Sequence, residues 1–279
     1  MNDLNDNRIL VLGATGKTGA RVARQLLQRG VPVRRAARGG ADVHFDWNDA
    51  STFASAVQGV AGIYLVSPVM RTDFASVVAQ FLDEAERTGV RHVTYLSAHG
   101  IEHAPPEVAL RAVELDLAAR TSLIHSIVRP AWFMQNFSET FLKPVNDTIV
   151  VPCGIGAEAF VDADDIAAVA VATLCHPARH AGQAYAPAGP EALTFEEAAA
   201  HLSDVAGRRI AYRDIDRDAW IAAMTQAGVP AEYGEVLRML TETVASGRGS
   251  RPNDDVLTAT GVPPTRFKDF AARTAAAWR

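Results

Sequence analysis

The chain has 279 residues, of which 48% are hydrophobic and 21% charged, and its net charge is −5. This length supports one large core, or one main domain with a smaller appendage. No basic block indicates nucleic-acid binding, and no stretch reaches the roughly 18 apolar residues that a membrane span requires. The two cysteines, Cys153 and Cys175, lack metal-ligand spacing, and residues 1–8 lack the apolar region of a signal peptide. We therefore expect a cytoplasmic protein that binds no metal, nucleic acid or membrane.

The first half of the chain alternates strand-like and helical segments. The predicted strands, in chain order, are 9–13, 31–37, 42–46, 62–67, 92–97 and 123–128. Helical patterns separate them, such as residues 72–89, where apolar positions recur at helical spacing and Gly89 indicates the end. This alternation predicts an α/β fold with a Rossmann-like, doubly wound parallel sheet. After about residue 145 short strands mix with helices, which predicts a smaller, interleaved α/β lobe over 146–279.

Three glycines follow the first predicted strand, in the stretch GATGKTG. Gly13 allows a tight turn, Gly16 lets the backbone approach a pyrophosphate, and Gly19 allows close packing of helix on strand. The helix that follows points its free N–H groups and the positive end of its dipole toward bound phosphates. The spacing is GxxGxxG rather than GxGxxG, and an ordinary glycine-rich turn is the alternative. The position between a strand and a helix favours a dinucleotide site.

Five segments occur in an order and at separations that resemble the NmrA-like group of atypical short-chain dehydrogenases/reductases. They are VLGATGKTG, IYLVSP, HVTYLSAHG, IVRPAWFMQNF and FVDADDIAAVA. The resemblance implies a nicotinamide dinucleotide cofactor and, for many members, reduction of quinones, triphenylmethane dyes or iminium ions. Carried onto the glycine-rich stretch, it implies that the cofactor contacts are made by Gly13, Thr15, Gly16, Lys17, Thr18 and Gly19.

The second predicted strand ends in arginines rather than in a carboxylate that would bind a ribose 2′-hydroxyl. Arg34 and Arg35 point to opposite sides of the strand, because strand side chains alternate. Arg38 matches the family's 2′-phosphate position and its guanidinium can clamp a phosphate in bidentate fashion, with Lys17 adding charge. A solvated basic loop is the alternative. The prediction is NADP(H) as the preferred cofactor, with NAD(H) as the second choice.

Carboxylates near the predicted strand ends and helix starts have both binding and capping interpretations. Asp46, at the end of the third predicted strand, resembles the residue that accepts a hydrogen bond from the adenine amino group. A helix N-cap near Asp49 is the alternative for this neighbourhood. Asp162 or Asp164 is expected to cap the helix that begins in FVDADDIA, without a chemical role.

Ligands of open parallel sheets lie beyond the carboxyl ends of the strands, at the crossover. The fourth predicted strand runs into Ser67 and Pro68, which we expect to flank the ribose or nicotinamide. The fifth runs into Ser97 and His99, which we expect to face the reacting end of the cofactor. His99 is the one histidine placed to act as an acid, and a plain surface-loop position is an equal alternative.

The usual proton-donor pair of short-chain reductases, Tyr-x-x-x-Lys, is absent. Neither Tyr64 nor Tyr95 has a lysine four residues later. The helix expected at 107–120 carries Arg111 and no lysine, and arginine stays protonated at working pH. Reduction of a simple ketone needs an acid or an oxyanion hole, whereas reduction of an iminium ion needs neither. The sequence therefore favours iminium-like or conjugated acceptors.

A segment rich in large side chains, residues 129–137, follows the sixth predicted strand. Trp132 and Phe133 bring apolar area and Asn136 an amide, which beyond a strand end often line a substrate pocket. Core packing is the alternative for at least half of the large side chains here. Further side chains that would close the pocket, unless helix packing accounts for them, are Trp220, Met224 and Met239.

These features predict an NADPH-dependent oxidoreductase acting on a small quinone, enone or cyclic imine. Residues 1–145 are expected to hold the dinucleotide, and 146–279 to bind most of the substrate. The alternative is a non-catalytic NAD(P) sensor of the NmrA type. The missing lysine favours the sensor and the retained aromatic segment favours the enzyme. The sequence leaves a homodimer open.

Overall fold

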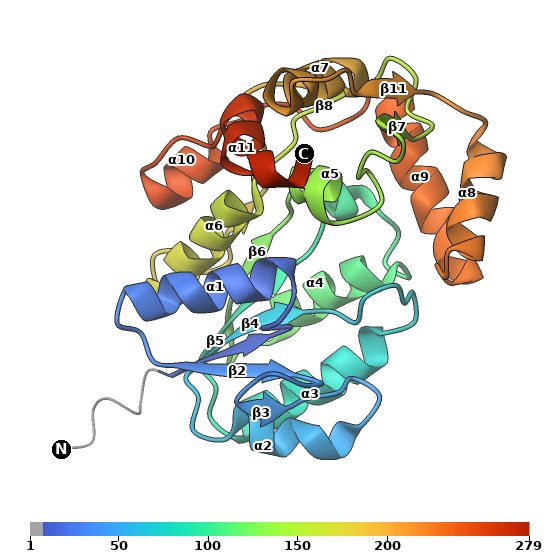
Figure 1. Ribbon diagram of the computed structural model, residues 1–279. Helices are drawn as coiled ribbons and strands as arrows, with labels where there is room; N and C mark the ends of the chain where they lie inside the picture. The colour runs from blue at the N-terminus through green and yellow to red at the C-terminus, as the bar shows by residue number, and fades with distance from the viewer. Residues whose placement is uncertain (1–7, 279) are drawn as a thin grey trace.

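A computed structural model of the chain describes residues 8–278 and is shown in Figure 1. Its centre is a seven-stranded sheet in the order β3-β2-β1-β4-β5-β6-β9, in which all neighbours pair in parallel. The strands are β1 (Ile9–Leu12), β2 (Val33–Ala37), β3 (Val43–His44), β4 (Gly62–Val66), β5 (His92–Leu96), β6 (Ile124–Val128) and β9 (Ala184–Tyr185). The predicted doubly wound Rossmann-like sheet is confirmed. Its strand order reverses between β1 and β4, where such sheets bind ligands.

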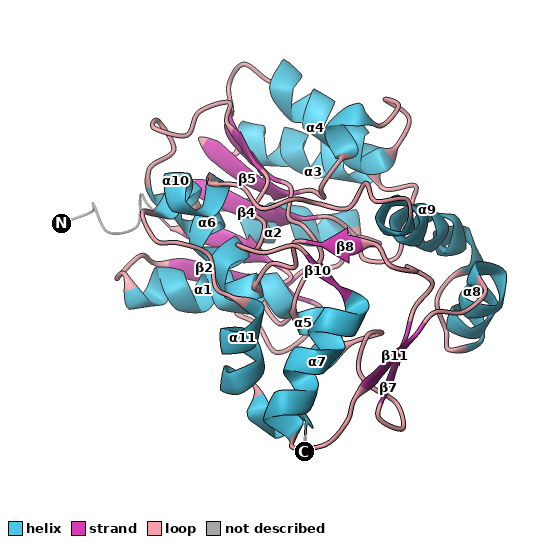
Figure 2. Ribbon diagram, turned by 90° about the horizontal axis from the view of Figure 1, so that it is seen from above, coloured by secondary structure: helices cyan, strands magenta, loops and turns pink. Residues whose placement is uncertain are grey.

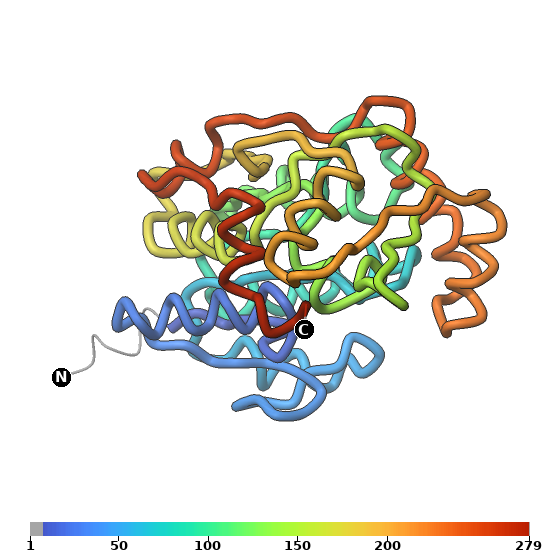
Figure 3. The backbone as a smooth tube through the Cα atoms, turned by 45° about the horizontal axis from the view of Figure 1, so that its top comes forward, coloured from blue at the N-terminus to red at the C-terminus, as the bar shows by residue number. Residues whose placement is uncertain are grey.

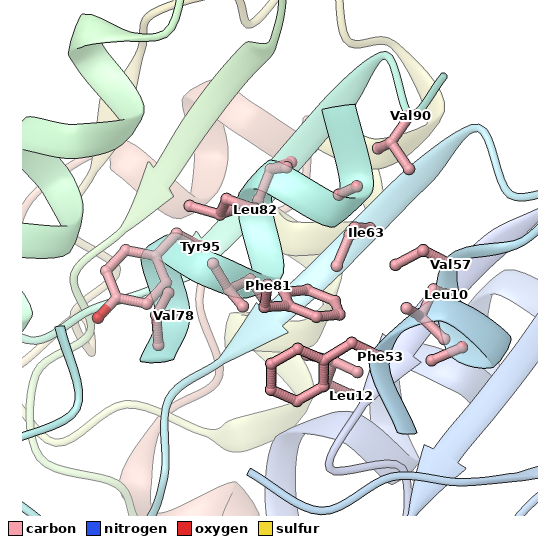
Figure 4. Close-up of a cluster of buried hydrophobic side chains, with 14 of the residues drawn as sticks. Leu10, Leu12, Phe53, Val57, Ile63, Val78, Phe81, Leu82, Val90 and Tyr95 are labelled. Atoms are coloured by element: carbon pink, nitrogen blue, oxygen red, sulfur yellow. The ribbon is translucent and has the colours of Figure 1, made fainter. Parts of the chain in front are cut away.

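Helices cover both faces of the sheet. One face carries α2 (Phe53–Val57), α3 (Ala75–Arg87) and α4 (Ala109–Ala119), and the other carries α1 (Lys17–Gln28), α6 (Ala163–Cys175) and α10 (Asp255–Thr260). On β1, Leu10 and Leu12 point into the first layer, where Phe81 meets them (Figure 4), and Ile9 and Val11 point into the second. Because both of its faces are buried, β1 is apolar along its whole length.

The remaining elements form a smaller lobe, which lies above the main sheet in Figure 1 and overlies part of it in the view from above in Figure 2. It contains α5 (Gln135–Glu139), β7 (Thr148–Val150), β8 (Ala157–Glu158), β10 (Leu193–Thr194), α7 (Phe195–Ala206), β11 (Ala211–Arg213), α8 (Arg217–Gln226), α9 (Gly234–Ala245) and α11 (Phe267–Arg273). Its core is aromatic, with Phe160 and Phe195 in edge contact at 5.3 Å. β9 and α6 return to the main sheet, so the chain passes between the two parts more than once (Figure 3). The boundary at residue 145 remains a prediction.

Local signals explain where several elements end. α3 stops at Arg87 and Gly89 follows with φ of 86°, a conformation that favours glycine. β3 is shorter than the predicted strand 42–46, because Asp42 is bound by Arg35 and Asp46 already turns the chain. Every helix within residues 8–278 is too short or too polar to cross a bilayer.

Candidate functional site

The loop between β1 and α1 owes its shape to three glycines. Gly13 adopts φ of 59°, the left-handed region in which glycine is favoured. A Cβ on Gly19 would lie 2.2 Å from the carbonyl oxygen of Gly13, so α1 approaches the strand end only because this side chain is missing. Gly16 occupies the N-cap of α1, and no side chain caps the helix there. The first N–H groups of α1 are therefore available to an anion.

The two threonines of this loop differ in exposure. Thr15 is exposed beside Gly16, within reach of a ligand, whereas Thr18 is buried in the first turn of α1. Thr15 is therefore the threonine whose hydroxyl is open to a bound phosphate, and Thr18 contributes to packing.

The three arginines near the end of β2 have different surroundings. Arg34 donates to main-chain carbonyl oxygens at the end of α2, including that of Ala56 at 3.0 Å. Arg35 pairs with Asp42, with 2.6 Å between Nη2 and Oδ1. Arg38 is exposed, and its guanidinium makes no hydrogen bond or ion pair with any residue of 8–278. Of the three arginines, Arg38 is thus the one whose guanidinium donors are free to bind a ligand.

The predicted helix caps are present, and Asp46 uses only one of its two carboxylate oxygens in a hydrogen bond among the described residues. Asp49 accepts from the backbone N–H of Ser51 and caps the short 3₁₀ helix Ala50–Thr52. Asp46 Oδ1 accepts from the N–H of Asn48 at 2.9 Å. The other Asp46 oxygen has no partner among the described residues and can still accept a hydrogen bond. Asp162 caps α6 by accepting from the N–H of Asp164, as predicted.

The carboxyl ends of β4 and β5 meet through two hydroxyl groups. Ser67 Oγ and Tyr95 Oη lie 2.8 Å apart, and Pro68 follows in a half-buried position. Burial raises the pKa of the Tyr95 hydroxyl far above its usual range, so this phenol remains protonated. Ser97 directly follows β5 and is buried. His99 is exposed, and its backbone N–H donates to the carbonyl of Pro130.

A buried carboxylate that sequence reasoning missed lies behind Ser97. Glu114, on α4, is 1% exposed and accepts from Arg129 at 2.8 Å and from Arg111 at 2.9 Å. Burial alone would raise the pKa of Glu114, but the hydrogen bonds from Arg129 and Arg111 and the charge of Arg129 outweigh it and lower the pKa. Glu114 therefore stays ionised and supplies no proton, and Arg111 is committed to it.

The aromatic segment after β6 is divided between a surface and a core. Trp132 is half-buried and contacts Phe141 and Phe195 edge-on, with 5.9 Å between the ring centroids in each pair. Phe133 is also half-buried and packs toward the main sheet. Trp220 is buried and donates its indole N–H to the carbonyl of Val150. Of the side chains expected to close the pocket, Trp220 and Met224 therefore belong to the lobe core, and Met239 is 51% exposed on α9.

Lys17 does not lie toward Arg38 but toward the smaller lobe. Its ammonium donates to Asn136 Oδ1 at 3.1 Å and to Thr140 Oγ1 at 2.9 Å, across the short helix α5 that lies above the start of α1 in Figure 1. Burial lowers the pKa of Lys17. Arg21, one turn along α1, pairs with Glu139 at 3.0 Å and reinforces the contact. The glycine-rich loop and the segment with Trp132, Phe133 and Asn136 are thereby joined.

Comparison with known proteins agrees with this architecture. The model of the NmrA-like family matches residues 5–252. The uncharacterized oxidoreductase YesF of Bacillus subtilis is 36% identical over 99% of this chain and 98% of its own, and agroclavine dehydrogenase of Claviceps fusiformis is 31% identical over 97% and 98%. Triphenylmethane reductase of Citrobacter sp., solved with NADP(H), superposes with a TM-score of 0.79 at 22% identity, covering 96% of this chain and 99% of that one.

The solved structure shares the fold, and the sequence relatives carry oxidoreductase names. These matches span nearly the whole chain, and they agree with the resemblance carried by the five sequence motifs. The chain belongs to the NmrA-like family.

Proposed function

We propose that this protein is an NADPH-dependent reductase that transfers hydride to a small, flat acceptor that is conjugated or cationic, such as a quinone, an enone or a cyclic iminium ion. One observation carries the proposal. Among residues 8–278, the carboxyl edge of the sheet presents two groups of free donors, the uncapped start of α1 and the guanidinium of Arg38, while neither Tyr95 nor Glu114 is an acid that can readily protonate an alkoxide.

The residues of this edge fit a phosphorylated dinucleotide. The backbone N–H groups that follow Gly16 suit a pyrophosphate, and Arg38 suits a 2′-phosphate because its donors are unused. The vacant oxygen of Asp46 suits an amino group such as that of adenine. We expect Ser67, Pro68 and Ser97 to lie beside the ribose and nicotinamide of the cofactor. A reduced nicotinamide bound here supplies hydride.

The acceptor class follows from what the side chains of this edge do with protons. Tyr95 keeps its proton and is bonded to Ser67, and Glu114 has none to give. Hydride addition to an iminium ion gives a neutral amine, and addition to a quinone or enone spreads the negative charge by resonance. Neither product needs a strong acid in the transition state. A simple ketone does, and we expect it to react slowly.

The substrate surface is supplied by the segment after β6. Trp132 and Phe133 are half-buried rather than sealed in the core, and Asn136 adds an amide next to them. Stacking and cation–π attraction on such rings favour a flat or cationic ligand. The names of two relatives, agroclavine dehydrogenase and triphenylmethane reductase, are consistent with acceptors of this kind.

The test is steady-state oxidation of NADPH with menadione, cyclohexenone, a dihydroisoquinolinium ion, a cationic triarylmethane dye and cyclohexanone. We expect turnover with the conjugated and cationic compounds and little with cyclohexanone, and a lower KM for NADPH than for NADH. Preferential reduction of cyclohexanone would overturn the acceptor class. Tight NADPH binding without turnover of any compound would favour the alternative function, a dinucleotide sensor.

A further inference from the structure

We propose that Lys17 is a positioning residue, which holds the amide of Asn136 so that its NH₂ group is presented as the hydrogen-bond donor to the oxygen of a conjugated carbonyl acceptor. The inference rests on the proposed reductase function and narrows its substrate class. It gives Lys17 a task different from phosphate binding, the role expected from the sequence.

Three polar groups form a closed triangle between α1 and α5. Lys17 Nζ donates to Asn136 Oδ1 and to Thr140 Oγ1, at 3.1 and 2.9 Å, and Thr140 Oγ1 donates in turn to Asn136 Oδ1 at 3.2 Å. An ammonium group has three donors and no acceptor, so the amide atom that faces Lys17 must be the oxygen. The hydroxyl of Thr140 accepts from Lys17 and has only its own hydrogen to offer Asn136, which demands the same orientation.

The opposite end of the amide is left with unused donors. Asn136 Nδ2 carries two hydrogens, and neither is donated to any group of residues 8–278. The side chain is half-buried, and its nitrogen is not among the sealed polar atoms without partners. A donor held in one orientation, with its acceptor end saturated, loses little freedom when it binds an oxygen.

The amide of Asn136 lies between the proposed cofactor site and the proposed substrate surface. Lys17 directly follows Gly16, the N-cap that we assign to the cofactor, and Asn136 is four residues from Trp132. The ion pair of Arg21 with Glu139 fixes α5 on the same helix. The donor thus lies where the pyrophosphate loop meets the proposed substrate surface.

Hydride addition to a conjugated carbonyl needs no strong acid, but a hydrogen-bond donor at its oxygen speeds the addition. Hydride transfer breaks a C4–H bond of the reduced nicotinamide and forms one C–H bond on the acceptor, and the displaced π electrons move onto the carbonyl oxygen, which later takes a proton from water. The acceptor gains two electrons and the nicotinamide is oxidised by two. An N–H donor aimed at this oxygen stabilises the charge as it develops. A cationic acceptor becomes neutral on hydride addition, and the donor gives it no advantage.

The sharpest variant is Asn136→Asp, which retains an oxygen for Lys17 and replaces the NH₂ group with a second oxygen. We expect kcat/KM for menadione to fall by about 100-fold or more, while a cationic triarylmethane dye reacts at least as well as with wild type. Lys17→Met leaves the amide unfixed and should cost about 10-fold with menadione alone. Lys143→Met, an exposed lysine in the same segment, is the matched control and should change neither rate.

A binding measurement without turnover completes the test. With NADP⁺ bound no hydride is available, so calorimetry can compare fluorenone with fluorene, which has the same flat frame without the carbonyl. Wild type should prefer fluorenone by about 3- to 10-fold, and both variants should lose the preference. Equal losses for menadione and the dye, or an unchanged fluorenone preference in Asn136→Asp, would overturn the proposal. A wild type that reduces neither acceptor would instead refute the reductase function, while the fluorenone comparison would still decide the role of Asn136.

Discussion

Polar side chains at the two edges of the central sheet differ in whether their donors have partners within the protein. At the amino edge, the ring of His92 donates to the carbonyl of Leu174 at 3.1 Å and lies so close over Gly62 that a Cβ there would be 2.2 Å from the imidazole. At the carboxyl edge, the guanidinium of Arg38 and the NH₂ group of Asn136 have no partner within residues 8–278. His92 is thus satisfied within the protein and contributes to stability, whereas Arg38 and Asn136 present donors that a ligand can use.

The largest effect should follow from closing the backbone approach at the carboxyl edge. A Cβ on Gly16 already lies 3.2 Å from the carbonyl oxygen of Gly13, and the branches of valine would occupy the space for a pyrophosphate. We expect Gly16→Val to weaken NADPH binding by at least about 100-fold, or ~2.7 kcal/mol, in calorimetry. Its circular dichroism should match wild type, which shows that the loss is local. Binding of NADPH at wild-type affinity would place the pyrophosphate elsewhere.

At the amino edge the corresponding effect is on stability and depends on pH. Burial lowers the pKa of His92 to about 4, although its bond to Leu174 opposes the shift. Below pH ~6.5 His92 binds a proton in the unfolded chain but not in the native protein. The free energy of unfolding therefore falls as the pH drops from about 6.5 toward about 4. We expect a loss of up to about 3 kcal/mol in urea unfolding across this window.

His92→Gln removes the titrating group and should flatten that part of the pH profile, whatever its own stability. An unchanged slope in the variant would show that other groups cause the acid sensitivity. NADPH affinity at neutral pH should be the same in both proteins, because His92 lies at the edge away from the cofactor loop.

A smaller and more selective effect is expected from Arg38→Ala. Loss of a charge-assisted hydrogen bond at this exposed position should cost roughly 1.5–3 kcal/mol, about 10- to 150-fold in the Kd of NADPH. The Kd of NADH should change little, because it lacks the 2′-phosphate. Arg35→Ala is the matched control, since Asp42 already holds that guanidinium. Equal weakening of both cofactors would contradict the assignment of Arg38.

The smallest effect is expected at His99, which is exposed and held only through its backbone. If no residue acts as an acid toward cationic acceptors, His99→Ala should reduce turnover of an iminium ion by less than about twofold. A loss of about 100-fold would instead make His99 the missing proton donor.

The parts of the fold that depend on short-range patterns were predictable from the sequence. Gly13, Gly16 and Gly19 define the loop because their neighbours are the strand and helix on either side, and Asp162 caps the helix it precedes. Apolar runs identified the main strands, although β3 is shorter than predicted because Asp42 is used by Arg35.

The parts of the site that depend on packing between distant segments were not predictable. Lys17 and Asn136 are 119 positions apart, and no local pattern indicates that α5 rests on the start of α1. Glu114 has the sequence spacing of an ordinary helix residue, and only the fold shows it buried between Arg111 and Arg129. Their roles depend on how the smaller lobe and α4 pack against the sheet.

The central claim, that the open edge of the sheet delivers hydride from NADPH to a conjugated or cationic acceptor, can be tested by following one atom. The wild-type protein is supplied with NADPH deuterated on one face of C4 of the nicotinamide, then separately on the other face, and the reduced acceptor is analysed by mass spectrometry. The account predicts that a single deuterium reaches the product from one face only. NADPH that binds but passes no deuterium to any acceptor in the panel would contradict it.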